Sequence, residues 1–363
     1  MGFKCGIVGL PNVGKSSLFN ALTRATASAE NYPFCTIDPN VGVVAVPDER
    51  LNKLCDIVQP KRRMPAQMEF VDIAGLVEGA AEGEGLGNQF LAHIRETQAI
   101  ALVTRCFENE NVAHVNGRID PAADIELIHT ELALADLATV EKALTRHKRR
   151  AGSGDKQAQQ QIASLVAVQN WLSDGKPVRD MGLGESVLED VAELHLLTIK
   201  PVLYVANVDE ASLNGNVHSE VVEDMARKSG AVAIRLCAAI EAEIATLDED
   251  GISEFFAELG IAESGLNLLI RAGYELLMLE TFFTAGPKEC RAWTISKSTC
   301  APQAAGVIHT DFERGFIRAE VIGYQDYIVH NGEQGARDAG KWRLEGRDYT
   351  VRDGDVIEFR FNV

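Results

Sequence analysis

The sequence predicts an α/β protein in which helices cover both faces of a parallel sheet, with a helical insertion and a small β-rich domain after it. Three observations lead to this fold class. Short β-rich runs alternate with helix-like stretches in the first 120 residues and again from residue 200, an order typical of a parallel sheet. Residues 121–199 carry apolar residues at helical spacing. Residues 280–363 carry short alternating strands between Gly and Asp turns.

The strands of the predicted parallel sheet come from six short apolar runs. The last two runs follow the insertion and resume the pattern of the first four, so we expect all six in one nucleotide-binding core. They are FKCGIVG (3–9), VGVVAV (41–46), MEFVDIA (68–74), AIALVTRCF (99–107), PVLYVAN (201–207) and AVAIRLCAA (231–239).

The insertion, residues 121–199, is predicted to form an antiparallel helical hairpin. Two stretches with helical spacing of apolar residues are separated by AGSGD (151–155), whose glycines suit a reversal. The basic run HKRR (147–150) then lies near the turn, as either a solvated helix end or a contact for RNA or another partner. The apolar positions are Leu127, Leu134, Leu137, Val140, Leu144, Ile162, Leu165, Val166 and Leu172.

The C-terminal part is predicted to be a β-rich module. A helix-like stretch at 265–283 precedes it, and one helix is expected at 301–313. The predicted strands are CRAWTI, GFIRAEVIGY, DYTV and VIEFRFNV.

Composition excludes several classes of function. A net charge of −18 disfavours broad, salt-driven coating of nucleic acid, so no DNA partner is expected, although a local basic patch could dock RNA. The N-terminus MGFKCGIVGL lacks the features of a signal peptide, and no apolar run approaches membrane-spanning length, so we expect a cytoplasmic protein without a membrane partner. The 7 cysteines form no C-x-x-C pair, which indicates reduced thiols.

The stretch GLPNVGKSS (9–17) fits the phosphate-loop pattern G-x-x-x-x-G-K-[ST], between a predicted strand and a predicted helix. Gly9 and Gly14 permit backbone conformations in which successive N–H groups converge on phosphate oxygens. Lys15 is predicted to bridge the β- and γ-phosphates, and the Ser16 hydroxyl to bind Mg²⁺. The phosphate-binding residues that we expect are Asn12, Val13, Gly14, Lys15, Ser16 and Ser17.

Two later segments complete the predicted site. Asp72 ends the run MEFVDIA and can hold a metal-bound water, while the N–H of Gly75 can meet the γ-phosphate. Thr36, in NYPFCTIDPN between these motifs, is the candidate second metal hydroxyl. The Gly-rich stretch 78–89 is either a mobile segment or a plain surface loop. This arrangement favours a switch NTPase over a metabolite kinase, because a kinase needs a separate acceptor pocket.

At this point the sequence closely resembles the YchF or Obg-like ATPase family of P-loop proteins, over essentially the whole chain. The resemblance rests on GLPNVGKSS, PFCTIDPN, FVDIAGLVEGA, GEGLGNQFL, CFENENVAHV, NVDE and HTDFERGFIRAEVI. It implies a Ras-like P-loop NTPase domain of Obg type over 1–120 and 200–279, a coiled-coil-like hairpin over 121–199, and a TGS-like β-grasp domain over 280–363. It also implies a ribosomal partner.

The turn Asn207-Val208-Asp209-Glu210 stands where guanine-specific switches have Asn-Lys-x-Asp. That aspartate accepts hydrogen bonds from N1–H and the 2-amino group of guanine, which adenine does not offer. Glu210 takes its place and Val208 replaces the lysine, so we expect ATP to be preferred to GTP. The family implies that Asn207 and the adjacent backbone bind the adenine 6-amino group. Alternatively Asp209 is the base reader, which would make the protein a GTPase.

The predicted catalytic residues also differ from those of common switch GTPases, because Leu76 stands where those proteins have a glutamine that orients the attacking water. The resemblance suggests His114 in its place, together with Lys15, and His93 is a weaker rival. Asn12 resembles the asparagine with which related proteins bind an activating K⁺.

We therefore expect a Mg²⁺-dependent ATPase that releases ADP and phosphate and acts on the ribosome in translation or stress regulation, as a monomer. The alternatives are a GTPase of the same fold and a nucleotide-dependent binding module in which hydrolysis is incidental.

Overall fold

The computed structural model describes residues 3–27, 40–73, 86–108 and 118–362, in two compact units. The first unit comprises residues 1–43 and 69–269, and the second comprises residues 44–68 and 270–363. The second unit is therefore assembled from two separate segments of the chain. The domain boundaries given above, including the one at residue 280, stay predictions.

The first unit is built on a six-stranded sheet with the order β2-β4-β1-β5-β6-β7. The pairs β1–β4, β1–β5, β5–β6 and β6–β7 are parallel, as the alternating pattern predicted. The prediction was wrong for the edge strand β2, which runs antiparallel to β4, since Val46 N–H donates to the carbonyl oxygen of Ala66 and Asp72 N–H to that of Asn40. Every residue of β5 and β6 is buried, which is typical of central strands covered by helices on both faces. The strands are β1 (Lys4–Val8), β2 (Val41–Ala45), β4 (Gln67–Asp72), β5 (Ala99–Arg105), β6 (Val202–Asn207) and β7 (Val232–Leu236).

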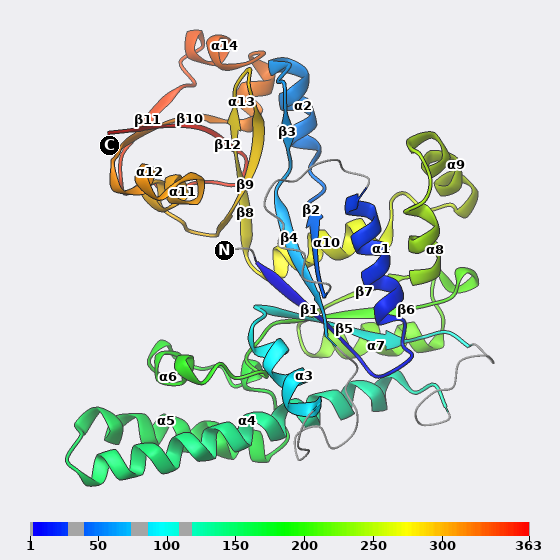
Figure 1. Cartoon of the computed structure of the whole chain (residues 1–363), viewed down its shortest axis with the longest axis vertical. Helices are drawn as coiled ribbons and strands as arrows, with labels where there is room; N and C mark the ends of the chain where they lie inside the picture. The colour runs from blue at the N-terminus through cyan, green and yellow to red at the C-terminus, as the bar shows by residue number, and fades with distance from the viewer. Residues whose placement is uncertain (1–2, 28–39, 74–85, 109–117, 363) are drawn as a thin grey trace. The chain divides into compact units, whose positions relative to one another are not determined.

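Helices flank this sheet, and α8, α9 and α10 follow its last strand (Figure 1). They are α1 (Lys15–Ala27), α3 (Leu86–Arg95), α7 (Val217–Lys228), α8 (Ala238–Ile244), α9 (Glu249–Leu259) and α10 (Gly265–Leu276). The run AVAIRLCAA was predicted to be one strand, but the strand ends at Leu236 and α8 begins at Ala238.

The insertion forms the predicted hairpin, in which α4 (Pro121–Gly152) and α5 (Lys156–Ser173) lie alongside each other (Figure 1). The Asp120 side chain accepts from the N–H of Ala123, and Asp155 accepts from that of Ala158, so each helix begins at an aspartate cap. A short helix, α6 (Glu185–Val191), follows. The apolar core between these helices includes Val140, Ala143, Leu144, Leu165, Val168 and Leu172.

The second unit contains a mixed sheet with the order β11-β10-β12-β8-β9-β3. Strand β12 is antiparallel to β10 and parallel to β8, and β3 is parallel to β9, with Arg63 opposite Cys290. The strands are β3 (Arg63–Met64), β8 (Leu279–Ala285), β9 (Cys290–Ser296), β10 (Phe316–Gly323), β11 (Arg343–Glu345) and β12 (Asp355–Phe361). The helices are α2 (Glu49–Val58), α11 (Ala301–Ile308), α12 (Thr310–Arg314), α13 (Tyr324–Val329) and α14 (Glu333–Asp338).

Three predictions about the C-terminal part were wrong in detail. The expected helix 265–283 ends at Leu276, and the β-branched and aromatic residues after it form β8. The expected helix 301–313 is two helices, because His309 is extended at φ −161° and ψ 142°. DYTV forms only a single bridge, between Thr350 and Cys300. Among the described residues, no helix is long and apolar enough to cross a membrane.

Candidate nucleotide-binding site

The residues of the predicted site lie at one edge of the first unit's sheet, because parallel strands end together. Ile7 of β1 pairs with Asp72 at the end of β4. Arg105 at the end of β5 pairs with Asn207 at the end of β6. In open α/β sheets ligands bind at this carboxyl edge of the strands.

The loop between β1 and α1 has the conformation that its glycines allow. Gly14 has φ +97°, and Asn12 also has a positive φ of 63°. A Cβ at Gly9 would lie 2.5 Å from the carbonyl oxygen of Val103, and one at Gly14 would overlap the Asn207 amide. Both positions therefore need glycine, because other atoms approach too closely for a side chain. The N–H groups that follow Gly14 belong to the first turn of α1, where they can bind an anion.

Lys15 is buried beside this loop, although it carries a cationic group. Its side chain is only 7% exposed, and its Nζ donates to the carbonyl oxygen of Leu10 at 2.6 Å. Burial lowers the pKa of Lys15 to about 8, against the opposing effect of Asp72. Burial likewise raises the pKa of Asp72, and the charge of Lys15 opposes that shift. The pair is thus held in a poorly solvated setting in which an anionic ligand would stabilise the lysine charge.

Asn207 ties three parts of the site together through its amide. Its Nδ2 donates to the carbonyl oxygen of Val13 at 2.9 Å, and its Oδ1 accepts from the N–H of Ala238 at 3.0 Å. The side chain is 4% exposed. Asn207 therefore joins the phosphate loop to the first residue of α8. Ala238 was missed by the sequence analysis; the change from the β-rich run to CAAIEAEI, at the sheet edge, is the signal that could have found it.

The remaining residues of the Asn-Val-Asp-Glu turn differ in their surroundings. Val208 is buried, and its N–H donates to the carbonyl oxygen of Leu236 at 2.9 Å. Glu210 is exposed and begins a short 3-10 turn. Asp209 is half-buried, and its Oδ1 is buried without a hydrogen-bond partner among the described residues. An unpartnered carboxylate oxygen is costly, so it is a position where a ligand donor would be stabilised.

The structure brings only part of the predicted set together. Lys15, Asp72 and Asn207 lie at the same sheet edge, whereas His93 is exposed on α3. Asn12, Ser16 and Ser17 are exposed on the loop and the first turn of α1. The other predicted residues, Thr36, Gly75 and His114, lie outside the described residues, as does Leu76.

The oxygen donors at this sheet edge suit Mg²⁺ better than a metal whose ligands all come from protein side chains. Within the described ranges no group of three or more His, Cys, Asp or Glu residues could hold a metal ion. Magnesium needs only one or two protein oxygens, because it keeps several waters and takes the rest of its ligands from phosphates. The exposed Ser16 hydroxyl and the Asp72 carboxylate provide such a pair.

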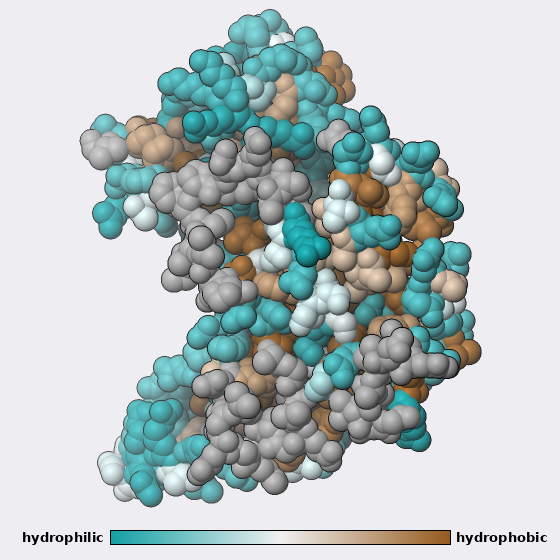
Figure 2. Space-filling model, turned by 45° about the vertical axis from the view of Figure 1, so that its right-hand side comes forward, coloured by the Kyte–Doolittle hydropathy of each residue, from teal (hydrophilic) through white to brown (hydrophobic). Residues whose placement is uncertain are grey.

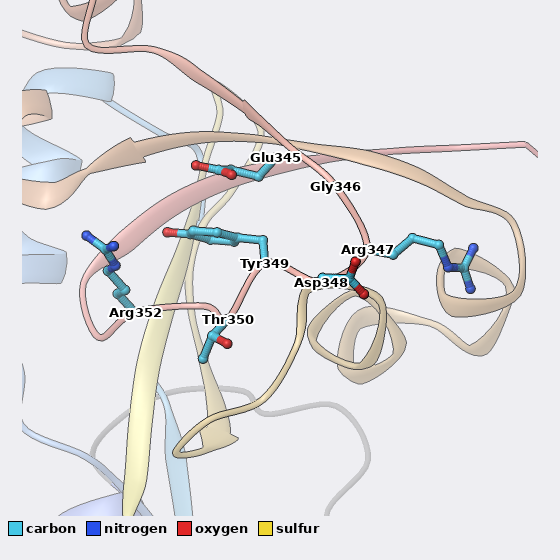
Figure 3. Close-up of a pocket in the computed structure, with 7 residues that line it drawn as sticks. All are labelled: Glu345, Gly346, Arg347, Asp348, Tyr349, Thr350 and Arg352. Carbon is cyan, nitrogen blue, oxygen red and sulfur yellow. The ribbon is translucent and has the colours of Figure 1, made fainter.

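The second unit carries a concavity that differs in character from the sheet edge. A shallow cavity of about 640 Å³ is bounded by residues 345–350 and 352, with Glu345 beside the Tyr349 ring and Arg347 pointing away from it (Figure 3). The Tyr349 hydroxyl donates to Asp355 at 2.7 Å, so its polar group is already used by the fold. With no phosphate loop beside it, the cavity does not compete with the sheet edge as a nucleotide site.

Comparison with known proteins decides the family. A family model described as 50S ribosome-binding GTPase matches residues 4–131, and the model YchF-GTPase_C, a protein of unknown function (DUF933), matches residues 279–362. The "Ribosome-binding ATPase YchF" of Haemophilus influenzae is 58% identical over 363 residues, covering 100% of both chains. This chain belongs to the YchF family. The predicted family is thereby confirmed.

Other YchF proteins agree in sequence and in structure. The Bacillus subtilis protein of the same name is 53% identical over 366 residues, with 100% of both chains covered. The solved structure of the Schizosaccharomyces pombe YchF GTPase matches 99% of this chain and 98% of its own, at 38% identity and a TM-score of 0.91. A GTP binding protein from Pyrococcus horikoshii, with 19% identity, a TM-score of 0.63 and coverage of 99% and 100%, shares the fold. The predicted P-loop α/β fold with a C-terminal β-rich domain is confirmed.

Proposed function

We propose that this chain is an ATP-hydrolysing switch that binds the ribosome. The observation that carries the proposal is full-length similarity, at 58% identity, to relatives named ribosome-binding ATPases. The intact phosphate loop supports it, because Gly14 has the required positive φ and Lys15 is buried beside Asp72. The family model described as a 50S ribosome-binding GTPase supports the ribosomal partner.

The chain's own residues would act mainly by positioning and by charge. The N–H groups after Gly14 would hold the phosphates at the start of α1, and the Lys15 cation would offset the negative charge that grows on the β–γ bridge. Ser16 and Asp72 would hold Mg²⁺, with Thr36 as a third oxygen. Bound Mg²⁺ supplies charge that neutralises the phosphate oxygens. His114 would orient or deprotonate the attacking water, since Leu76 cannot.

Preference for ATP follows from the turn at the end of β6. Glu210 is exposed, and Val208 is buried where guanine-specific proteins have a lysine. The buried and unpartnered Oδ1 of Asp209 favours a second candidate, a GTPase, because this oxygen could accept from guanine. It could equally accept from the 6-amino group of adenine. Affinities for ATP, ADP, GTP and GDP, measured for wild type and Asp209→Asn, distinguish these functions.

The proposal further includes activation by K⁺ through Asn12, a monomeric state, a cytoplasmic location and no DNA partner. Asn12 supports the first point, because it is exposed in the phosphate loop with a positive φ of 63°. Equal hydrolysis rates in Na⁺ and K⁺ would remove the potassium site.

A turnover assay tests the whole proposal. Wild-type protein should release phosphate from ATP, faster when purified ribosomes are present. Lys15→Ala should abolish this release, whereas Lys4→Ala, a partly exposed lysine at the far end of β1, should not. Phosphate release that persists in Lys15→Ala would belong to a contaminant. Wild-type protein that binds nucleotide without turnover, with or without ribosomes, would favour the binding-module alternative.

A further inference from the structure

Positive charge is concentrated at the turn end of the helical hairpin, although the net charge of the whole protein is negative. Between residues 142 and 156 the only acid is Asp155, although the chain carries a net charge of −18. The cations there are Lys142, Arg146, Lys148, Arg149, Arg150 and Lys156, and all of them are exposed. Figure 2 shows a predominantly hydrophilic surface in this region, at the lower left.

Most of these cations form a stripe along one face of α4. Residues 142, 146, 149 and 150 follow the spacing i, i+4, i+7, i+8, which places them on one side of a helix. The opposite side packs into the hairpin, where Leu144 is 4% and His147 6% exposed. From residue 142 to residue 149 the helix rises about 10 Å, so long side chains along the stripe can reach successive phosphates of a nucleic-acid strand. The stripe is therefore the solvent face of a helix whose opposite face is packed.

The one acid in this region is already used by the fold. Asp155 caps α5 and also accepts from Arg150 at 2.7 Å. Among the described residues, Lys142, Arg146 and Arg149 have no carboxylate within ion-pair distance. Three like charges are thus left on one helix face, where their mutual repulsion is unfavourable until an anion binds.

We propose that this stripe binds the phosphate backbone of RNA, which makes the hairpin end a contact of this protein with ribosomal RNA. The proposal rests on the function proposed above. A membrane surface fits less well, because no large apolar side chain is exposed in residues 141–161 that could insert beside the cations. The neighbouring exposed surface of α5 instead carries Gln157, Gln159 and Gln160, whose amides suit hydrogen bonds to phosphate and ribose.

The test replaces the three unpaired cations of the stripe by glutamine, as Lys142→Gln, Arg146→Gln and Arg149→Gln together. Arg150 is retained because it pairs with Asp155. Binding to purified ribosomes and to a 20-base-pair RNA duplex is measured from 50 to 300 mM KCl. Loss of three phosphate contacts should make the slope of log affinity against log salt less negative by about 2–3. It should also weaken binding roughly 10- to 100-fold at 0.1 M KCl.

The control makes the same charge change with exposed lysines outside the hairpin, and its slope should equal that of wild type. It consists of Lys228→Gln, Lys288→Gln and Lys297→Gln. Turnover of ATP without ribosomes and the thermal midpoint should be unchanged in both triple variants, because all six side chains are exposed.

The two proposals fail in different ways. Wild-type protein that binds RNA duplex through the stripe but does not bind ribosomes would sink the proposed function and support the RNA site. Ribosome binding that is equal in wild type and the stripe variant, with equal salt slopes, would overturn the RNA site alone. Loss of ribosome binding without a change in slope would indicate a protein contact and would also overturn it.

Discussion

Replacing Asn207 by alanine tests whether one buried amide holds the nucleotide site together. The substitution removes two hydrogen bonds and leaves the carbonyl of Val13 and the N–H of Ala238 without these partners in a buried setting. Each bond is worth about 1 kcal/mol net, and each buried group left unsatisfied costs about 1–3 kcal/mol. Allowing for partial rescue by water, we expect a loss of about 2–4 kcal/mol in unfolding free energy. ATP affinity should fall as well, because Val13 belongs to the phosphate loop.

The assay is chemical and thermal unfolding without nucleotide, followed by titration with ATP. For a unit of this size the expected loss lowers the thermal midpoint by roughly 4–16 °C. Asn214→Ala is the matched control, because Asn214 is exposed in the loop that precedes α7. If Asn207→Ala kept wild-type stability and wild-type ATP affinity, the amide would not hold the loop, and the reasoning would be refuted.

Three further predictions concern the same site. Gly14→Ala should weaken ATP binding at least tenfold, because its Cβ would overlap the Asn207 amide, whereas Gly154→Ala has a similar φ of +90° but nothing within 4 Å and should leave affinity unchanged. Because the pKa of Lys15 is about 8 in the folded protein and 10.5 normally, the unfolded chain binds more protons between these values, so stability should rise from pH 8 to 10.5 relative to Lys15→Met. ATP affinity should fall over that range in wild type but not in Lys15→Met, as isothermal titration can measure. His114→Ala should lower kcat about 10²- to 10⁴-fold with little change in ATP affinity; an unchanged kcat would contradict its catalytic role.

Local patterns predicted most of the nucleotide-binding core. The phosphate loop is a contiguous motif whose geometry depends on its own glycines, and Asp72 was placed by the strand that it ends. The hairpin was likewise predicted, because both helices carry their caps and apolar spacing within themselves. The Asn207 bonds could not be predicted, since they join segments far apart in the chain and depend on backbone atoms of Val13 and Ala238.

The C-terminal part was harder to predict for the same reason. The stretch 265–283 has continuous apolar character, so only the tertiary contacts of β8 show where the helix ends. DYTV alternates like a strand, but Tyr349 and Thr350 lie in the loop before β12, and the neighbour of β10 is the shorter β11. Nothing in residues 44–68 indicates that they belong with residues 270–363.

The two segments of the second unit are synthesised at different times, because residues 69–269 lie between them. Arg63 finds its β-sheet neighbour Cys290 only after most of the polypeptide has left the ribosome, because the second unit needs both of its segments. Pairings so distant in the chain are slow to form. The amphipathic helix α2 is synthesised early, but its packing partners β8, β9 and α13 come from the later segment. Partly synthesised chains therefore expose Leu51 and Leu54, which are buried in the finished protein.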